Sequence, residues 1–102
     1  MKTIRHWVDG QYYEGTPIGR FPVENPGTGE IEGELLQASD ADLDHAIEVA
    51  RRAQREWAKV SLAKRTAIMF RMRQLVLDHQ DEMARMIVAE HGKNYSDAVG
   101  EI

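Results

Sequence analysis

The stretch from Ser61 to Gly92 constrains the fold of this chain more than any other, because it holds no proline and its only glycine is the last residue. Apolar residues recur along it in steps of three and four, which is the spacing of one helix face. We expect this stripe to pack against a core, covered by the segments before it, rather than to line a ligand pocket. The stripe consists of Leu62, Met69, Met72, Leu75, Val76, Met83, Met86 and Ile87.

Capping residues divide this stretch into two helices. The hydroxyl of Ser61 can accept from the first backbone N–H groups of a helix. Gly92 suits the left-handed conformation that ends many helices. Between them, the polar run from Asp78 to Asp81 indicates a break, with Asp81 restarting the second helix. We therefore predict helices at about 61–79 and 81–91.

The first part of the chain has the pattern of β-hairpins. Asp9-Gly10 lies between two short strand-like runs and suits a two-residue turn with positive φ at both central positions. A second turn is expected at Asn25–Gly29. The residues after it alternate, with glutamates on one face and Ile31, Gly33 and Leu35 on the other, as in a half-buried strand. These patterns predict β-hairpins over about residues 6–37.

Three glycines after Asn25 invite comparison with a dinucleotide-binding loop. Gly27, Gly29 and Gly33 have the spacing G-x-G-x-x-x-G, which is one residue too long. A phosphate-binding loop also needs a helix N-terminus directly after it, and a strand pattern follows here instead. We therefore expect these glycines to serve a turn or a bulge.

Two further helices complete the expected elements. Ser39 and Asp42 form a capping pattern before a helix at 40–57, whose apolar face includes Leu43, Ile47 and Trp57. Ser96 is expected to cap a helix at 96–102. The chain is thus predicted to be α+β, with hairpins in 1–38 and a helical layer in 39–102. Its last helix has barely begun, so we expect a piece of a larger protein; a frayed tail is the alternative.

Composition narrows the classes of function. The 102 residues allow one small domain, with no cysteine for disulfides, thiolate metal sites or a thiol nucleophile. No apolar run approaches the ~20 residues of a membrane span, and the N-terminus lacks the apolar region of a secretion signal. We expect a cytoplasmic protein without a membrane partner.

Charge is strongly segregated within the net −4. Residues 1–48 carry ten acids and three bases, whereas the segment 51–73 carries eight bases and only Glu56 as an acid. Such a basic segment could attract nucleic acid or another acidic partner. Solvated helix faces are the commoner explanation, and no aromatic residues alternate with the bases to stack on nucleobases. The bases are Arg51, Arg52, Arg55, Lys59, Lys64, Arg65, Arg71 and Arg73.

No constellation of residues indicates catalysis. The histidines His6, His45, His79 and His91 share no metal-ligand spacing. The serines at 39, 61 and 96 are explained as helix caps, and Asp81-Glu82 as first-turn acids. We predict no catalytic, no cofactor-binding and no metal-binding residue in this chain.

The order of these signals resembles the N-terminal segment of the aldehyde dehydrogenase superfamily, over nearly the whole chain. Three features are similar to its methylmalonate-semialdehyde dehydrogenase branch: SLAKR at 61–65, FRMRQL at 70–75, and His91 before Gly-Lys. The superfamily motifs are WVDGQ at 7–11, VENPGTGEI at 23–31, Ala38-Ser39 before the alanine-rich helix ending at Trp57, Arg65, EHGK at 90–93 and DAVGEI at 97–102.

The resemblance implies NAD-dependent oxidation of a semialdehyde to an acyl thioester of coenzyme A. The implied mechanism is attack by a cysteine thiolate, hydride transfer to nicotinamide, and attack on the thioester by coenzyme A. The family's nucleophile, oxyanion-holding Asn and cofactor-binding segments all come after the region that this chain covers. Some members hold a monovalent cation on main-chain carbonyls, which would lie near Val23 and Glu24.

Two readings of the partners follow. As a dehydrogenase segment, the chain would pack on the rest of that enzyme; detached, it would expose apolar surface around Phe70, Met72 and Ile102 and form a homo-oligomer. Neither NAD nor coenzyme A should then bind this chain alone, and nucleic acid should not be a partner. The alternative is a free-standing helical module that binds nucleic acid or an acidic partner through Arg51–Arg73.

Overall fold

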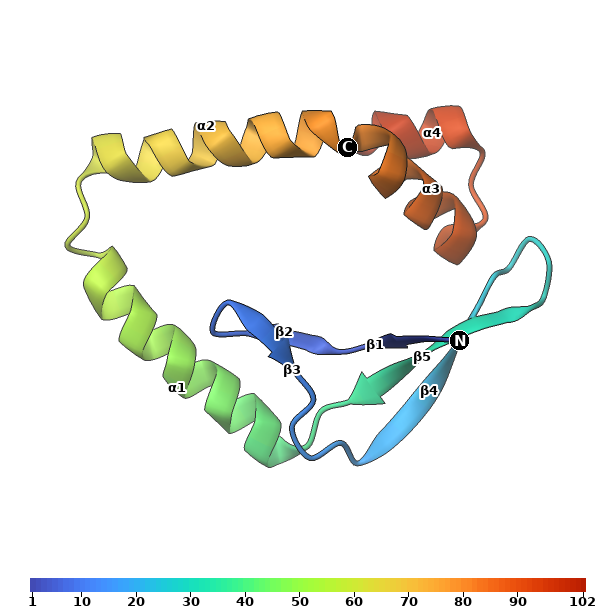
Figure 1. The fold of residues 1–102 in the computed structure, drawn as a ribbon, viewed down its shortest axis with the longest axis horizontal. Coiled ribbons are helices and arrows are strands. Elements are labelled where there is room, and N and C mark those ends of the chain that lie inside the picture. The colour runs from blue at the N-terminus through green and yellow to red at the C-terminus, as the bar shows by residue number, and fades with distance from the viewer. The chain divides into compact units, whose positions relative to one another are not determined.

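The computed structural model describes residues 1–102, which form two compact units. The first unit comprises residues 1–23 and 31–59, and the second comprises residues 24–30 and 60–102. Strands and one helix make up the first unit, and three helices with one turn make up the second (Figure 1). The elements are those of an α+β chain, as the sequence predicts.

A three-stranded sheet lies in the first unit, in the order β1-β5-β4 (Figure 1). Its strands are β1 (Lys2–Ile4), β4 (Gly19–Glu24) and β5 (Ile31–Gln37). β1 runs parallel to β5, with Lys2 opposite Gly33. A Cβ at Gly33 would lie 2.7 Å from the Lys2 carbonyl oxygen, so this glycine allows the two backbones to approach. The hairpin pattern did not predict β1 or its parallel pairing.

The hairpin predicted around Asp9-Gly10 is confirmed. β2 (His6–Val8) pairs antiparallel with β3 (Gln11–Tyr13). Asp9 has φ 57° and Gly10 has φ 75°, as a turn with two positive φ angles requires. Across the ladder, the rings of Trp7 and Tyr12 meet edge to face at 5.1 Å.

The helix α1 (Asp40–Trp57) has the bounds that the sequence predicts. The Ser39 hydroxyl accepts from the Asp42 N–H at 3.1 Å, and the Asp42 carboxylate accepts from the Ser39 N–H at 3.0 Å. This is a complete capping box with Asp in place of the usual Glu or Gln. It fixes where the helix starts.

Three helices form most of the second unit: α2 (Leu62–Asp78), α3 (Gln80–His91) and α4 (Tyr95–Gly100). Ser61 caps α2, and the left-handed Gly92 ends α3, as predicted. Two boundaries differ from the prediction. α3 begins at Gln80 directly after His79, and α4 is capped by Asn94, whose side chain accepts from the Asp97 N–H at 3.0 Å. Ser96 instead lies inside the first turn of α4 and donates to Asn94 Oδ1.

The turn between β4 and β5 packs against the end of α3. Asn25 closes the turn, since its carbonyl oxygen accepts from the N–H groups of Thr28 and Gly29 and its N–H donates to Glu30. A Cβ at Gly92 would lie 3.1 Å from Pro26 Cγ. Gly92 therefore serves both the helix end and the contact with this turn.

Burial departs from the sequence prediction. The buried apolar residues are Leu36, Ala84 and Ala98, and no residue of α2 is buried. The prediction that the α2–α3 stripe is covered is therefore wrong for most of its residues in this chain. Its exposed residues range from 36% exposure at Met83 to 73% at Leu62, and only Val76 and Ile87 are half-buried. Helical spacing determines which side chains share a face, but not whether another segment covers that face.

The face of β5 that the sequence predicts to be buried is buried only at Gly33. Ile31 and Leu35 on that face are exposed, whereas Leu36 is 2% exposed. On the acidic face, Glu34 forms an ion pair with Arg20 and accepts from Thr3, so this glutamate is partly buried rather than freely solvated. No helix is both long enough and apolar enough for a membrane crossing.

Candidate functional site

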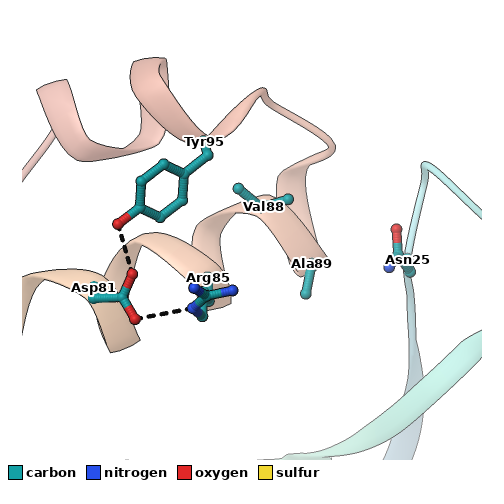
Figure 2. A pocket seen from close by; sticks show the side chains of 6 residues that line it. All are labelled: Asn25, Asp81, Arg85, Val88, Ala89 and Tyr95. Atoms are coloured by element: carbon teal, nitrogen blue, oxygen red, sulfur yellow. Dashed lines mark hydrogen bonds and ion pairs between the residues drawn. The ribbon is translucent and has the colours of Figure 1, made fainter.

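A surface hollow in the second unit brings together polar and apolar side chains from three segments (Figure 2). Asp81 and Arg85 stand one turn apart on α3, followed by Val88 and Ala89 on the same helix. Tyr95 comes from the first turn of α4, and Asn25 from the turn after β4. The spacing of four between Asp81 and Arg85 makes them neighbours on the helix surface.

The carboxylate of Asp81 joins the polar residues of the hollow. Arg85 Nε donates to Asp81 Oδ2 at 2.9 Å, and the Tyr95 hydroxyl donates to Asp81 Oδ1 at 2.6 Å (Figure 2). The guanidinium carbon of Arg85 lies 5.8 Å from the centre of the Tyr95 ring. Asp81 thus holds both the arginine and α4 in place.

These contacts shift the pKa values of all three groups. The hydrogen bond from Arg85, followed by the one from Tyr95, lowers the pKa of Asp81. The bond to Asp81 raises the pKa of Arg85, and the bond from the Tyr95 hydroxyl to Asp81, followed by desolvation, raises the pKa of Tyr95. At neutral pH the site therefore holds a carboxylate, a guanidinium and a neutral phenol, none of which is poised to exchange a proton.

A second cluster surrounds Asp42 in the first unit. Asp42 is only 4% exposed and accepts at Oδ1 from the Thr16 N–H at 2.9 Å and from the Tyr13 hydroxyl at 3.2 Å. Its Oδ2 accepts from the Ser39 N–H within the capping box. The Thr16 and Ser39 hydroxyls lie 3.1 Å apart beside it. The cluster joins β3, the following loop and the start of α1.

Its hydrogen bonds make Asp42 a structural anchor. The N–H donors of Ser39 and Thr16 lower the pKa of Asp42 from 3.8 to about 2, against the desolvation that raises it. The pKa of Tyr13 is raised, first by desolvation and then by its bond to Asp42. A carboxylate with so low a pKa and its oxygens occupied is a poor general base at neutral pH. The sequence indicated Asp42 as a cap, but gave no signal for its bonds to Tyr13 and Thr16.

The structure does not bring the histidines together. His79 Nδ1 lies 3.1 Å from Glu82 Oε2 at the exposed start of α3, and His91 stands in its last turn. In the first unit, the rings of His6 and His45 lie on the Tyr13 ring at centroid distances of 6.5 and 5.0 Å. No group of three or more His, Asp or Glu residues has the arrangement of a metal site.

Three further candidates from the sequence are the glycines after Asn25, the basic segment 51–73 and the cation position near Val23 and Glu24. Gly29 has φ 76° in the turn, and Gly33 lies within β5, so no helix N-terminus follows these glycines. Of the eight bases between 51 and 73, three lie on α1 and four on α2, and Lys59 forms an exposed ion pair with Glu56 at 3.0 Å. The possible cation position near Val23 and Glu24 stays a prediction.

Comparisons with known proteins place these observations in a family. Residues 12–102 match the model of the aldehyde dehydrogenase family. Malonate-semialdehyde dehydrogenase 3 of Geobacillus kaustophilus is 41% identical over 101 residues, which is 99% of this chain and 21% of that protein. Malonate-semialdehyde dehydrogenase 2 of Geobacillus thermodenitrificans is 40% identical over the same share of each chain.

Solved structures agree with the sequence matches. A protein of Sinorhizobium meliloti assigned as a methylmalonate-semialdehyde dehydrogenase, complexed with NAD, superposes with a TM-score of 0.96 at 39% identity over 100% of this chain and 21% of that one. The methylmalonate-semialdehyde dehydrogenase of Oceanimonas doudoroffii gives 0.94 at 40% identity, over 99% of this chain and 20% of that one. The chain spans about a fifth of the length of these relatives.

Proposed function

Because the chain belongs to the aldehyde dehydrogenase family, we propose that it is the N-terminal structural part of an NAD-dependent, coenzyme A-acylating (methyl)malonate-semialdehyde dehydrogenase. The observation that carries this proposal is the match of nearly the whole chain to a malonate-semialdehyde dehydrogenase at 41% identity. The similarity to a structure complexed with NAD supports the choice of cofactor. The coenzyme A step rests on the branch motifs in residues 61–75 and His91.

The residues of this chain do not fit a dinucleotide site of their own. The glycines after Asn25 lead into β5, whereas a pyrophosphate group needs the N–H groups of a helix start. The first turn of α3 carries Asp81 and Glu82, whose charges oppose a pyrophosphate group on the N–H groups at the start of that helix. We therefore assign the binding of NAD and coenzyme A to the remainder of the enzyme.

The chain alone should be catalytically inactive. It contains no cysteine, so the thiolate that attacks the aldehyde must come from elsewhere. The two carboxylates whose pKa values are shifted already have hydrogen-bond partners. Asp42 accepts from backbone amides, and Asp81 accepts from Arg85 and Tyr95. Its proposed contribution is to supply strands and helices against which the catalytic part packs.

The exposed apolar residues support a partner for this chain. Phe70 is 69% exposed and Met72 is 58% exposed on α2. We propose the rest of the dehydrogenase as the natural partner and a homo-oligomer as the state of the chain by itself. Equilibrium sedimentation of the 102-residue chain should show dimers or larger species; a folded monomer at high micromolar concentration would contradict the oligomer.

The decisive test starts from the protein in its source cells. An antibody against this segment should detect a species several times heavier than 11.6 kDa. That species, once purified, should form NADH from malonate or methylmalonate semialdehyde beyond the first turnover only when coenzyme A is present, because hydride transfer precedes the attack of coenzyme A on the thioester. The 102-residue chain is the inactive control. Sustained NADH formation over many turnovers without coenzyme A would remove the acylation step and leave the dehydrogenase.

A native species of 11.6 kDa would instead support the helical module that acts through Arg51–Arg73. Binding of that kind must weaken steeply with salt. A mobility-shift assay with DNA and RNA at low and moderate salt would measure it. No observation presently favours this alternative, and the cytoplasmic location stays a prediction from the sequence.

A further inference from the structure

We propose that the hollow beside Arg85 binds an oxyanion, namely a carboxylate or phosphate carried on a short apolar group. This inference is independent of the dehydrogenase proposal, because it rests on the geometry of α3, α4 and the turn after β4. The chemistry would be reversible recognition, with no covalent step.

The first argument is the fixed position of the guanidinium. Arg85 uses its Nε to donate to Asp81, and Asp81 is itself held by the Tyr95 hydroxyl from α4. Of the five guanidinium N–H groups, those on Nη1 and Nη2 have no hydrogen bond within the chain. Two N–H groups side by side match the two oxygens of a carboxylate or phosphate. Because the side chain is already oriented, an anion would lose less side-chain entropy on binding it.

The second argument is the lining of the hollow. Val88 and Ala89 supply an apolar wall on α3, and the Tyr95 ring flanks the guanidinium from α4 (Figure 2). Asn25 lies on the other side, on the turn after β4. A ligand whose charged end meets Arg85 can therefore lay a short apolar group against Val88 and Ala89. A bare halide ion would use neither the paired donors nor this wall.

The third argument concerns charge. Asp81 neutralises Arg85, so the pair has no net charge and attraction over long range is weak. Recognition must then come from directed hydrogen bonds, and the Arg85 side chain is 72% exposed to competing water. We expect a dissociation constant on the order of 1 mM, with only a mild dependence on ionic strength.

Nuclear magnetic resonance titration of the 102-residue protein tests the proposal. Propanoate and inorganic phosphate, each added at constant ionic strength, should produce saturable shifts in the Arg85 guanidinium signals and in the amide signals of Val88 and Ala89. Chloride should not. A larger response to propanoate than to phosphate would show that the apolar wall contributes, and an equal response would restrict recognition to the oxyanion.

Two substitutions distinguish recognition by the oriented guanidinium N–H groups from attraction to a positive charge alone. Arg85→Lys keeps the positive charge but not the planar pair of donors, and it should abolish the saturable shifts. Arg71→Lys, on α2, is the matched control and should leave them intact. The proposal is overturned if chloride reproduces the shifts, if Arg71 responds as strongly as Arg85, or if Arg85→Lys with an unchanged circular dichroism spectrum binds like the original protein.

Discussion

Each unit contains an aspartate that lies in the first turn of a helix and accepts a hydrogen bond from a tyrosine hydroxyl. The two aspartates differ in their burial and in their other hydrogen-bond donors. Asp42 is 4% exposed and takes its remaining bonds from the backbone N–H groups of Thr16 and Ser39. The Asp81 side chain is 63% exposed and pairs with the guanidinium of Arg85. The arrangement around Asp42 joins β3, the following loop and the start of α1. The arrangement around Asp81 orients an arginine through its Nε alone.

The difference follows from the donors. Backbone N–H groups are already fixed by the chain, so a buried carboxylate that they satisfy loses little by staying ordered. An exposed ion pair must order two side chains, and water and salt compete with it. We therefore expect Asp42 to matter for stability and Asp81 mainly for the orientation of Arg85.

The largest expected effect comes from Gly15→Ala. Gly15 has φ 60°, and a Cβ there would overlap Asp42 Oδ1, so the substitution must displace the anchor. We expect a loss of about 2–3 kcal/mol in the free energy of unfolding, from backbone strain together with displacement of the anchor. Urea denaturation measures it.

Gly10→Ala is the matched control for that substitution. Gly10 has φ 75° but nothing within 4 Å of a built Cβ, so only the backbone cost of about 1–2 kcal/mol applies. An equal loss at the two glycines would mean that the contact with Asp42 contributes nothing.

Next in size is the contrast between Asp42→Asn and Asp81→Asn. The amide at position 42 would place an N–H₂ group against a backbone N–H donor in a buried site, which leaves polar groups unpaired. The shift of the urea midpoint should be roughly twice as large at 42 as at 81, or more. High salt should reduce the effect at 81 and leave the effect at 42 unchanged. The reverse order would invalidate the comparison.

The pH dependence of stability tests the contribution of Asp42 separately. The pKa of Asp42 is lowered from 3.8 to about 2 in the folded chain, so its contribution is complete above its ordinary pKa and is lost as the pH falls toward 2. Stability measured by urea denaturation should therefore fall between about pH 5 and pH 2. In Asp42→Asn this part of the profile should flatten; an unchanged slope would show that other carboxylates cause it.

The sequence predicted the local features of these two regions well. The Asp9-Gly10 turn, the Ser39 and Ser61 caps and the Gly92 helix end are all confirmed, because each depends on residues within a few positions of one another. The family also followed from short motifs in a fixed order, and the comparisons confirm it.

Most of the features that the sequence missed join distant residues; the cap of α4, which is Asn94 and not Ser96, is a local exception. The parallel pairing of Lys2 with Gly33 leaves no periodic signal in a three-residue strand. The bond from Thr16 to Asp42 spans 26 positions, and the bond from Tyr95 to Asp81 spans 14. Burial was missed for the same reason, since helical spacing gave α2 a stripe but could not indicate that the stripe stays exposed.

The smallest effects should come from the helix caps and should separate a cap from a neighbouring serine. Ser39→Ala removes half of the capping box beside Asp42 and should cost about 1 kcal/mol in the free energy of unfolding. Asn94→Ala should cost about 0.5–1 kcal/mol, because Asn94 caps the short exposed helix α4. Ser96→Ala should change stability by less than about 0.5 kcal/mol, since its hydroxyl only donates to the cap side chain. Thermal and urea denaturation of the three variants would rank them, and a Ser96 effect as large as that of Asn94 would restore Ser96 as the residue that starts α4.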